Sequence, residues 1–111
     1  MEQPPQFGLT VHPDRDRVRV AATGEIDLVT APLLETQLKD LWAAGWTDVI
    51  ADLSGVTFLD STGVHVLVTA RSDAIDHGAA FAITNGNAAV AQVLRICGVE
   101  DLLTSTPQSV E

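Results

Sequence analysis

Cysteine and basic residues are both scarce in this chain of 111 residues. The single cysteine, Cys97, excludes an internal disulfide and any metal site built from several cysteines. Six lysine and arginine residues stand against fifteen acidic residues, which gives a formal net charge of −9. Because nucleic acids and anionic membranes attract basic surfaces, this charge argues against both as main partners.

Long apolar segments are missing as well. No apolar run approaches the roughly 20 residues that a membrane-spanning helix needs. Residues 1–8 are polar and proline-rich, and they lack the basic and apolar regions of a secretory signal peptide. These features predict a cytoplasmic protein.

The hydrophobic content of 46% suits one folded domain, and strand-like and helix-like segments alternate along the chain. Arg17 and Arg19 alternate with Val18 and Val20, which predicts a half-buried strand over 17–23 that Gly24 ends. With a short strand over 9–12 it forms a hairpin. Further strands are expected over 80–84 and over 48–53, the latter apolar enough to be covered on both faces.

Three helices are expected. The first follows Thr30 as N-cap, has Pro32 in its first turn and stops at Gly45. The others span 61–77 and 87–97, and residues 102–104 fit either a last strand pairing or a helical turn. The side chains expected to face inward are Leu34, Leu38, Leu41 and Trp42 in the first helix, Val64, Leu67, Val68 and Ile75 in the second, and Val90, Val93, Leu94 and Cys97 in the third.

These elements predict an α/β fold with a small mixed β-sheet, in which an N-terminal hairpin is followed by βαβα units and helices pack on the sheet. One domain is expected over 1–111, with a core of about 8–105 and flexible tails at 1–7 and 106–111. Helix N-termini then meet at the carboxyl edge of the sheet, where such folds usually place their sites.

The most informative segment runs from the 48–53 strand into the second helix. Asp60, Ser61 and Thr62 crowd the start of that helix, and each of them is a suitable N-cap. A helix N-terminus also favours an anion, so a phosphate on Ser61 would be tolerated while adding about −1.5 to −2 charges at pH 7. The alternative reading is that these residues serve only as caps.

Two motifs resemble signatures of the anti-sigma factor antagonists of the bacterial STAS-domain family. Residues 58–64, Phe-Leu-Asp-Ser-Thr-Gly-Val, are similar to the phosphorylation loop of that family. Residues 24–27, Gly-Glu-Ile-Asp, followed by Thr-Ala-Pro at 30–32, resemble its second signature. The resemblance covers roughly residues 8–105 and implies a single STAS-like domain.

The resemblance implies a binding switch that is not an enzyme and needs no cofactor or metal. The unphosphorylated protein would bind an anti-sigma factor with serine kinase activity and so release a sigma factor. Phosphorylation of Ser61, or as second choice Thr62, would end binding, and a phosphatase would reset the switch. The free protein is expected to be a monomer or a weak dimer. The implied partner-binding residues are Glu25, Asp27, Asp60, Ser61, Thr62, Gly63 and His65, the last of which departs from the small residue usual in the family.

Three other readings stay open. A serine hydrolase would use Ser61, but Leu59 replaces the first glycine of G-x-S-x-G and neither His12 nor His77 has a spacing that recommends it. A phosphoaspartate receiver would use Asp52, but the early strands supply no acid pair for Mg²⁺. A STAS module without a kinase switch, acting as an accessory subunit of a transporter or a stress-sensing complex, is the third.

Overall fold

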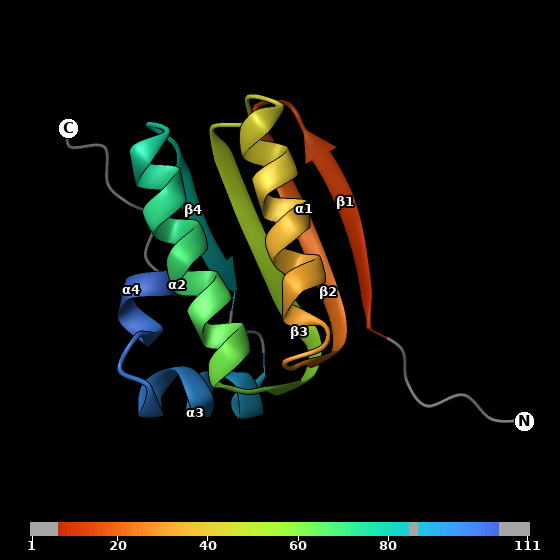
Figure 1. The fold of residues 1–111 in the computed structure, drawn as a ribbon, viewed down its shortest axis with the longest axis vertical. Helices are drawn as coiled ribbons and strands as arrows, with labels where there is room; N and C mark the ends of the chain where they lie inside the picture. Colours follow the sequence, from red (N-terminus) through yellow and green to blue (C-terminus); the bar gives the residue numbers. More distant parts are fainter. Residues whose placement is uncertain (1–6, 85–86, 105–111) are drawn as a thin grey trace, which may run out of the picture.

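The computed structural model describes residues 7–84 and 87–104, and of the expected tails only Phe7 falls within this range. Eight elements follow one another in the described chain (Figure 1). They are β1 (Gly8–Asp14), β2 (Arg17–Ile26), α1 (Ala31–Ala43), β3 (Asp48–Leu59), α2 (Ser61–Asp76), β4 (Ala80–Thr84), α3 (Ala88–Ile96) and α4 (Glu100–Thr104). The predicted α/β class is confirmed, and residues 102–104 belong to a helical turn.

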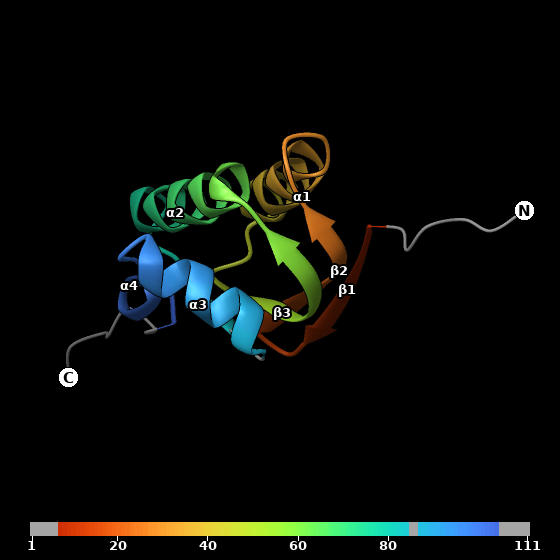
Figure 2. The same cartoon turned by 90° about the horizontal axis from the view of Figure 1, so that it is seen from below.

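The sheet is mixed and has the strand order β1-β2-β3-β4. β1 and β2 form the expected antiparallel hairpin, whereas β2, β3 and β4 run parallel to one another. Parallel strands need crossover connections, and α1 and α2 supply them on the same face of the sheet (Figure 2). As predicted, α1 and α2 therefore both begin at the carboxyl edge of the parallel strands (Figure 1).

Two predictions about the central strands were wrong. Gly24 does not end β2, which continues to Ile26 with a shift of register on either side of Gly24. The φ angle of 88° at Gly24 lies in the region that favours glycine, so this residue lets the strand bend and stay paired. β3 runs to Leu59, and it is not covered on both faces as predicted. Val49, Ala51 and Leu53 are buried on one face, whereas Ile50 and Asp52 on the other face are only partly buried.

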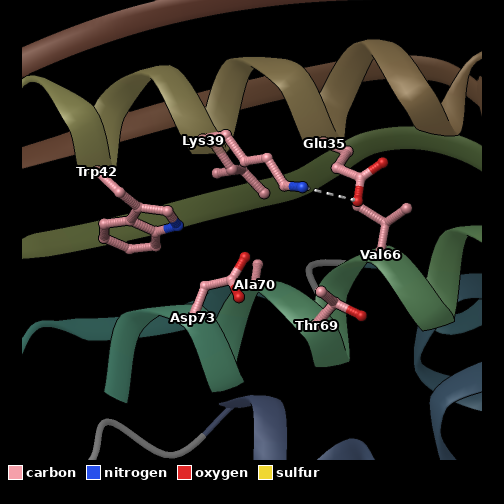
Figure 3. A pocket seen from close by; sticks show the side chains of 8 residues that line it. Glu35, Lys39, Trp42, Val66, Thr69, Ala70 and Asp73 are labelled. Carbon is pink, nitrogen blue, oxygen red and sulfur yellow. Dashed lines mark ion pairs between the residues drawn. The ribbon is translucent and has the colours of Figure 1, made fainter. Parts of the chain in front are cut away.

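α1 confirms its predicted pattern, because all four residues of its apolar stripe are buried. They face the sheet and α2. Figure 3 shows the seam between the two helices, where Trp42 lies opposite Ala70 and Asp73, and Lys39 pairs with Glu35 at 3.6 Å. Side chains fill this seam and leave about 0 Å³ of cavity volume. The seam therefore contributes packing and offers no room for a ligand.

The remaining helices depart from the predicted pattern at their ends. Val64 and Leu67 of α2 are buried as expected, but Ile75 is 53% exposed, and Val66, Ala70 and Ala74 complete the buried face instead. α3 buries Val90 and Leu94, whereas Val93 is only partly buried and Cys97 is exposed beyond the end of the helix. Among the described residues, no helix is both long and apolar enough to cross a membrane.

Candidate functional site

The site lies where β2 and β3 end, and it joins the two motifs found in the sequence. Ile26 and Leu59 are register partners at the ends of these adjacent strands. The N–H of Asp60 donates to the carbonyl oxygen of Ile26 at 3.2 Å, which ties the two exits from the sheet together. The turn into α1 and the start of α2 therefore lie side by side at one end of the molecule (Figures 1 and 2).

Asp60 is the residue that caps α2. Its backbone is extended, with φ −107° and ψ −175°, and its Oδ1 accepts a hydrogen bond from the N–H of Gly63 at 3.1 Å. Its carbonyl oxygen accepts the N–H of Val64 at 3.0 Å. Since Asp60 satisfies the cap, Ser61 does not have to, and the Ser61 side chain is exposed to solvent.

Gly63 allows the first turn of α2 to approach the sheet closely. A Cβ atom placed on Gly63 would lie 2.5 Å from Cδ1 of Leu59 and 2.7 Å from Cγ2 of Ile26, both of which are buried side chains. Gly63 is itself buried, so it packs the start of the helix against the sheet and is not part of the exposed surface. The spacing of Asp60, Ser61 and Gly63 in the motif thus has a packing reason besides any functional one.

The turn between β2 and α1 is held by Asp27. Its Oδ1 accepts hydrogen bonds from the N–H groups of Val29 at 2.9 Å and Thr30 at 3.1 Å. The hydrogen bond from the Thr30 N–H is the largest cause that lowers the pKa of the Asp27 carboxyl below its usual value of 3.8. Asp27 is therefore a carboxylate at neutral pH and fixes the conformation of the turn.

Thr30 precedes α1 as predicted, but its side chain does not cap the helix. The Thr30 hydroxyl donates to the carbonyl oxygen of Glu25 at 2.7 Å and accepts the N–H of Asp27 at 2.9 Å. This turns the hydroxyl back toward β2. The predicted cap is thus replaced by a small network that binds the end of β2 to the first residues of α1.

The other predicted site residues differ in exposure. Glu25 is exposed on β2, where its register partner is Phe58 on β3. Thr62 is half-buried in the first turn of α2, so it is less accessible than Ser61. His65 is exposed one turn further along α2. The structure therefore brings all seven predicted residues to one end of the molecule, with Ser61 the exposed hydroxyl among them.

The two segments that form the site carry acidic side chains and no lysine or arginine. Residues 24–38 and 53–70 contain no lysine or arginine, whereas Glu25, Asp27 and Asp60 bring three carboxylates to the ends of β2 and β3. Arg17 and Arg19 lie toward the start of β2, where they pair with Asp48 at 3.1 Å and Asp52 at 3.0 Å.

The geometry does not favour the two alternative chemistries. Within the described chain, no hydrogen bond joins Ser61 to a histidine; His77 instead contacts the carbonyl oxygen of Asp73 at 2.8 Å. Asp52 is engaged by Arg19, Ser54 and Thr84, and the Ser54 N–H is the largest cause that lowers its pKa. Over residues 7–84 and 87–104, no three His, Cys, Asp or Glu side chains are grouped so that they could hold a metal ion.

Sequence reasoning missed a group of exposed apolar side chains at this same end. Leu28 is 73% exposed, Val29 78%, Leu33 55% and Phe58 48%. Leu28 and Val29 stand together in the turn between Asp27 and Thr30, outside the apolar stripe of α1. Two adjacent apolar residues that precede a helix and do not fit its apolar spacing are the sequence signal that could have revealed this group.

Comparison with known proteins identifies the class. Residues 10–111 match the family model for the STAS domain, and the chain therefore belongs to the STAS domain family. The resemblance predicted from the two motifs is confirmed.

The similar proteins include several anti-sigma factor antagonists. The anti-sigma-F factor antagonist RsfB of Mycobacterium tuberculosis is 29% identical over 100 residues, which cover 90% of this chain and 81% of that protein. The anti-sigma-B factor antagonist of Bacillus subtilis is 27% identical over 103 residues, or 93% of this chain and 94% of that protein. A crystal structure of an anti-sigma factor antagonist from Mycobacterium paratuberculosis matches with a TM-score of 0.82 and 25% identity, covering 98% of this chain and 92% of that one.

Proposed function

We propose that this chain is an anti-sigma factor antagonist that works as a phosphorylation-controlled binding protein. Its unphosphorylated form binds an anti-sigma factor that is also a serine kinase, and this binding frees a sigma factor. The kinase transfers the γ-phosphoryl group of ATP to Oγ of Ser61, with loss of the hydroxyl proton and release of ADP. A phosphatase then uses water to cleave the O–P bond.

The observation that carries the proposal is that different residues cap α2 and offer an exposed hydroxyl at its start. Asp60 makes the capping hydrogen bond to Gly63, and the hydroxyl of Ser61 is exposed. A kinase can therefore reach Ser61, and a phosphate there removes no interaction that the fold needs. The free N–H groups of a helix N-terminus also favour an anion at this position. The modified chain is thus expected to stay folded.

The same phosphate is expected to dissociate a complex. It adds about −1.5 to −2 charges at pH 7 to a surface that already carries Asp27 and Asp60. Burying such a charge without a partner costs several kcal/mol, whereas about 1.4 kcal/mol is enough to weaken an affinity tenfold. The docking surface in this proposal comprises Glu25, Asp27, Asp60, Ser61, Thr62 and His65, with Gly63 beneath them.

The test is to purify the anti-sigma factors of the source organism and to measure their binding to four variants. Ser61→Ala is expected to bind like the unmodified chain and to resist phosphorylation, whereas Ser61→Asp is expected to bind at least tenfold more weakly. Ser72 is an exposed serine further along α2, so Ser72→Ala and Ser72→Asp are matched controls that should leave binding unchanged. Mass spectrometry after incubation with kinase and ATP should place the phosphate on the peptide that contains Ser61.

Two outcomes contradict the proposal. If Ser61→Ala and Ser61→Asp both bind as tightly as the unmodified chain, Ser61 is not the switch. If the chain binds anti-sigma factors but none of them phosphorylates it, it is a STAS module that is not controlled by a kinase. Phosphate found on Thr62 would move the switch by one residue.

A further inference from the structure

Four exposed apolar side chains lie on the segments that lead to and from the proposed switch. Leu28 and Val29 occupy the turn between β2 and α1, Leu33 the first turn of α1, and Phe58 the end of β3; we name these four residues the apolar tip. Only eight large apolar side chains are exposed in the described chain, so half of them gather at this end. Isolated exposed apolar residues are ordinary, but a group of them at one site marks an interaction surface.

The turn that carries Leu28 and Val29, two of the four residues of the apolar tip, is held by hydrogen bonds. Asp27 accepts the N–H groups of Val29 and Thr30, and the Thr30 hydroxyl bridges back to Glu25. Leu28 and Val29 are therefore presented to solvent by a turn that these hydrogen bonds fix at both of its ends. A pre-ordered apolar surface binds more tightly than a mobile one, because less conformational freedom is lost when it docks.

The apolar tip is close to Ser61 but does not include it. Ile26 and Leu59 are register partners, and Leu28 and Ser61 each lie two residues beyond them. Adjacent strands are about 4.8 Å apart, so one partner surface can cover both positions. Figure 2 views the molecule from this end and shows the β2–α1 turn beside the start of α2.

Charge indicates what covers the apolar tip. Its surroundings carry Glu25, Asp27 and Asp60 and contain no lysine or arginine in residues 24–38 and 53–70. A second copy of the chain would place these carboxylates against one another, and an anionic membrane would be repelled. The complementary partner is a protein surface with an apolar pocket and a basic rim.

We infer that the apolar tip is the affinity anchor of the docking surface, and that it inserts into an apolar pocket on the anti-sigma factor. The basic rim of that pocket faces Glu25 and Asp27 and leaves the place opposite Ser61 without a cation. This inference rests on the proposed function. It separates the surface into two parts: the apolar tip holds the complex, and Ser61 decides whether the complex survives. The acidic surroundings speed association and give it a dependence on salt.

The experiment compares three forms of the full chain against each purified anti-sigma factor of the source organism. The doubly substituted Leu28→Ser, Val29→Ser chain should lose affinity by about 30-fold or more, mainly through faster dissociation. Ile75→Ser is the matched control, because Ile75 is an exposed apolar residue near the far end of α2, and it should bind within about twofold of the unmodified chain. All three should unfold at closely similar temperatures, because the changed side chains are exposed.

The outcomes separate this inference from the proposed function. If the unmodified chain binds an anti-sigma factor and the doubly substituted chain binds it equally well, the anchor is wrong and the function stands. Equal losses in the double variant and in Ile75→Ser also overturn the anchor. If the unmodified chain binds no anti-sigma factor, the function fails and the anchor fails with it. If the unmodified chain self-associates in light scattering and the double variant does not, the occupant is a second copy, and the assignment to an anti-sigma factor is overturned.

Discussion

Replacing Gly63 by alanine tests the packing that positions the proposed switch. The new Cβ atom would lie 2.5 Å from Cδ1 of Leu59 and 2.7 Å from Cγ2 of Ile26. The terminal methyl of Leu59 can move, but Cγ2 of Ile26 is attached to a branched Cβ in a fully buried strand residue. Extra methyl groups in a packed core cost about 1–3 kcal/mol, against a gain of up to about 1 kcal/mol from the helix propensity of alanine.

The expected net loss in the free energy of unfolding therefore lies between about 0 and 3 kcal/mol, with a central value of about 1–2 kcal/mol. For a domain of this size that corresponds to a fall in Tm of roughly 4–15 °C. Chemical denaturation and a thermal melt followed by circular dichroism measure both quantities. Ser72→Ala is the control, because Ser72 is exposed on the same helix and its substitution should change stability by less than about 0.5 kcal/mol. A Gly63→Ala chain more stable than the unmodified chain, which is what the helix propensity of alanine alone predicts, would refute the close approach of α2 to the sheet.

Three further predictions concern single side chains. Asp60→Ala should lower the free energy of unfolding by about 0.5–2 kcal/mol, while Asp60→Asn keeps the cap and most of the stability, which denaturant titration measures. Asn87→Ala should cost a similar amount in the same assay, because Asn87 caps α3 and donates to the carbonyl oxygen of Val56 at 2.9 Å. Folding lowers the pKa of Asp52 below 3.8, so the stability it supplies is present above that pH and disappears as the pH falls through its folded pKa. The stability difference between the unmodified chain and Asp52→Asn should accordingly vanish in strong acid; a difference that stays constant with pH would contradict the role of its ionised form.

Helical periodicity predicted α1 well and α2 less well, for a physical reason. α1 contacts its neighbours through one stripe, so the spacing of Leu34, Leu38 and Leu41 identifies its buried face. α2 packs against α1, β3, β4 and α4, so its buried face is broader and includes Val66, Ala70 and Ala74. Alanine occurs on buried and exposed faces alike, so its spacing does not reveal the buried face. Ile75 is apolar, but it lies near the end of the helix and outside this face.

Positions at the ends of elements were also hard to predict from local pattern. Gly24 has the residue type of a strand breaker, but pairing with β3 keeps it inside β2. Cys97 continues the apolar spacing of α3, but it falls just after the last helical residue and is exposed. For Gly24, contacts with another strand override the local preference. For Cys97, no part of the described fold covers the side chain, so the local pattern does not lead to burial.

The order of strands and helices, the burial of α1 and the position of Ser61 at a helix start all follow from local sequence, because they depend on spacing and on turn residues. The packing of Gly63 against Ile26, and the meeting of the Leu28–Val29 turn with the start of α2, depend on tertiary structure. These features arise where β2 and β3 end together. The two strands are separated in sequence by α1, so the register between them decides which residues meet there.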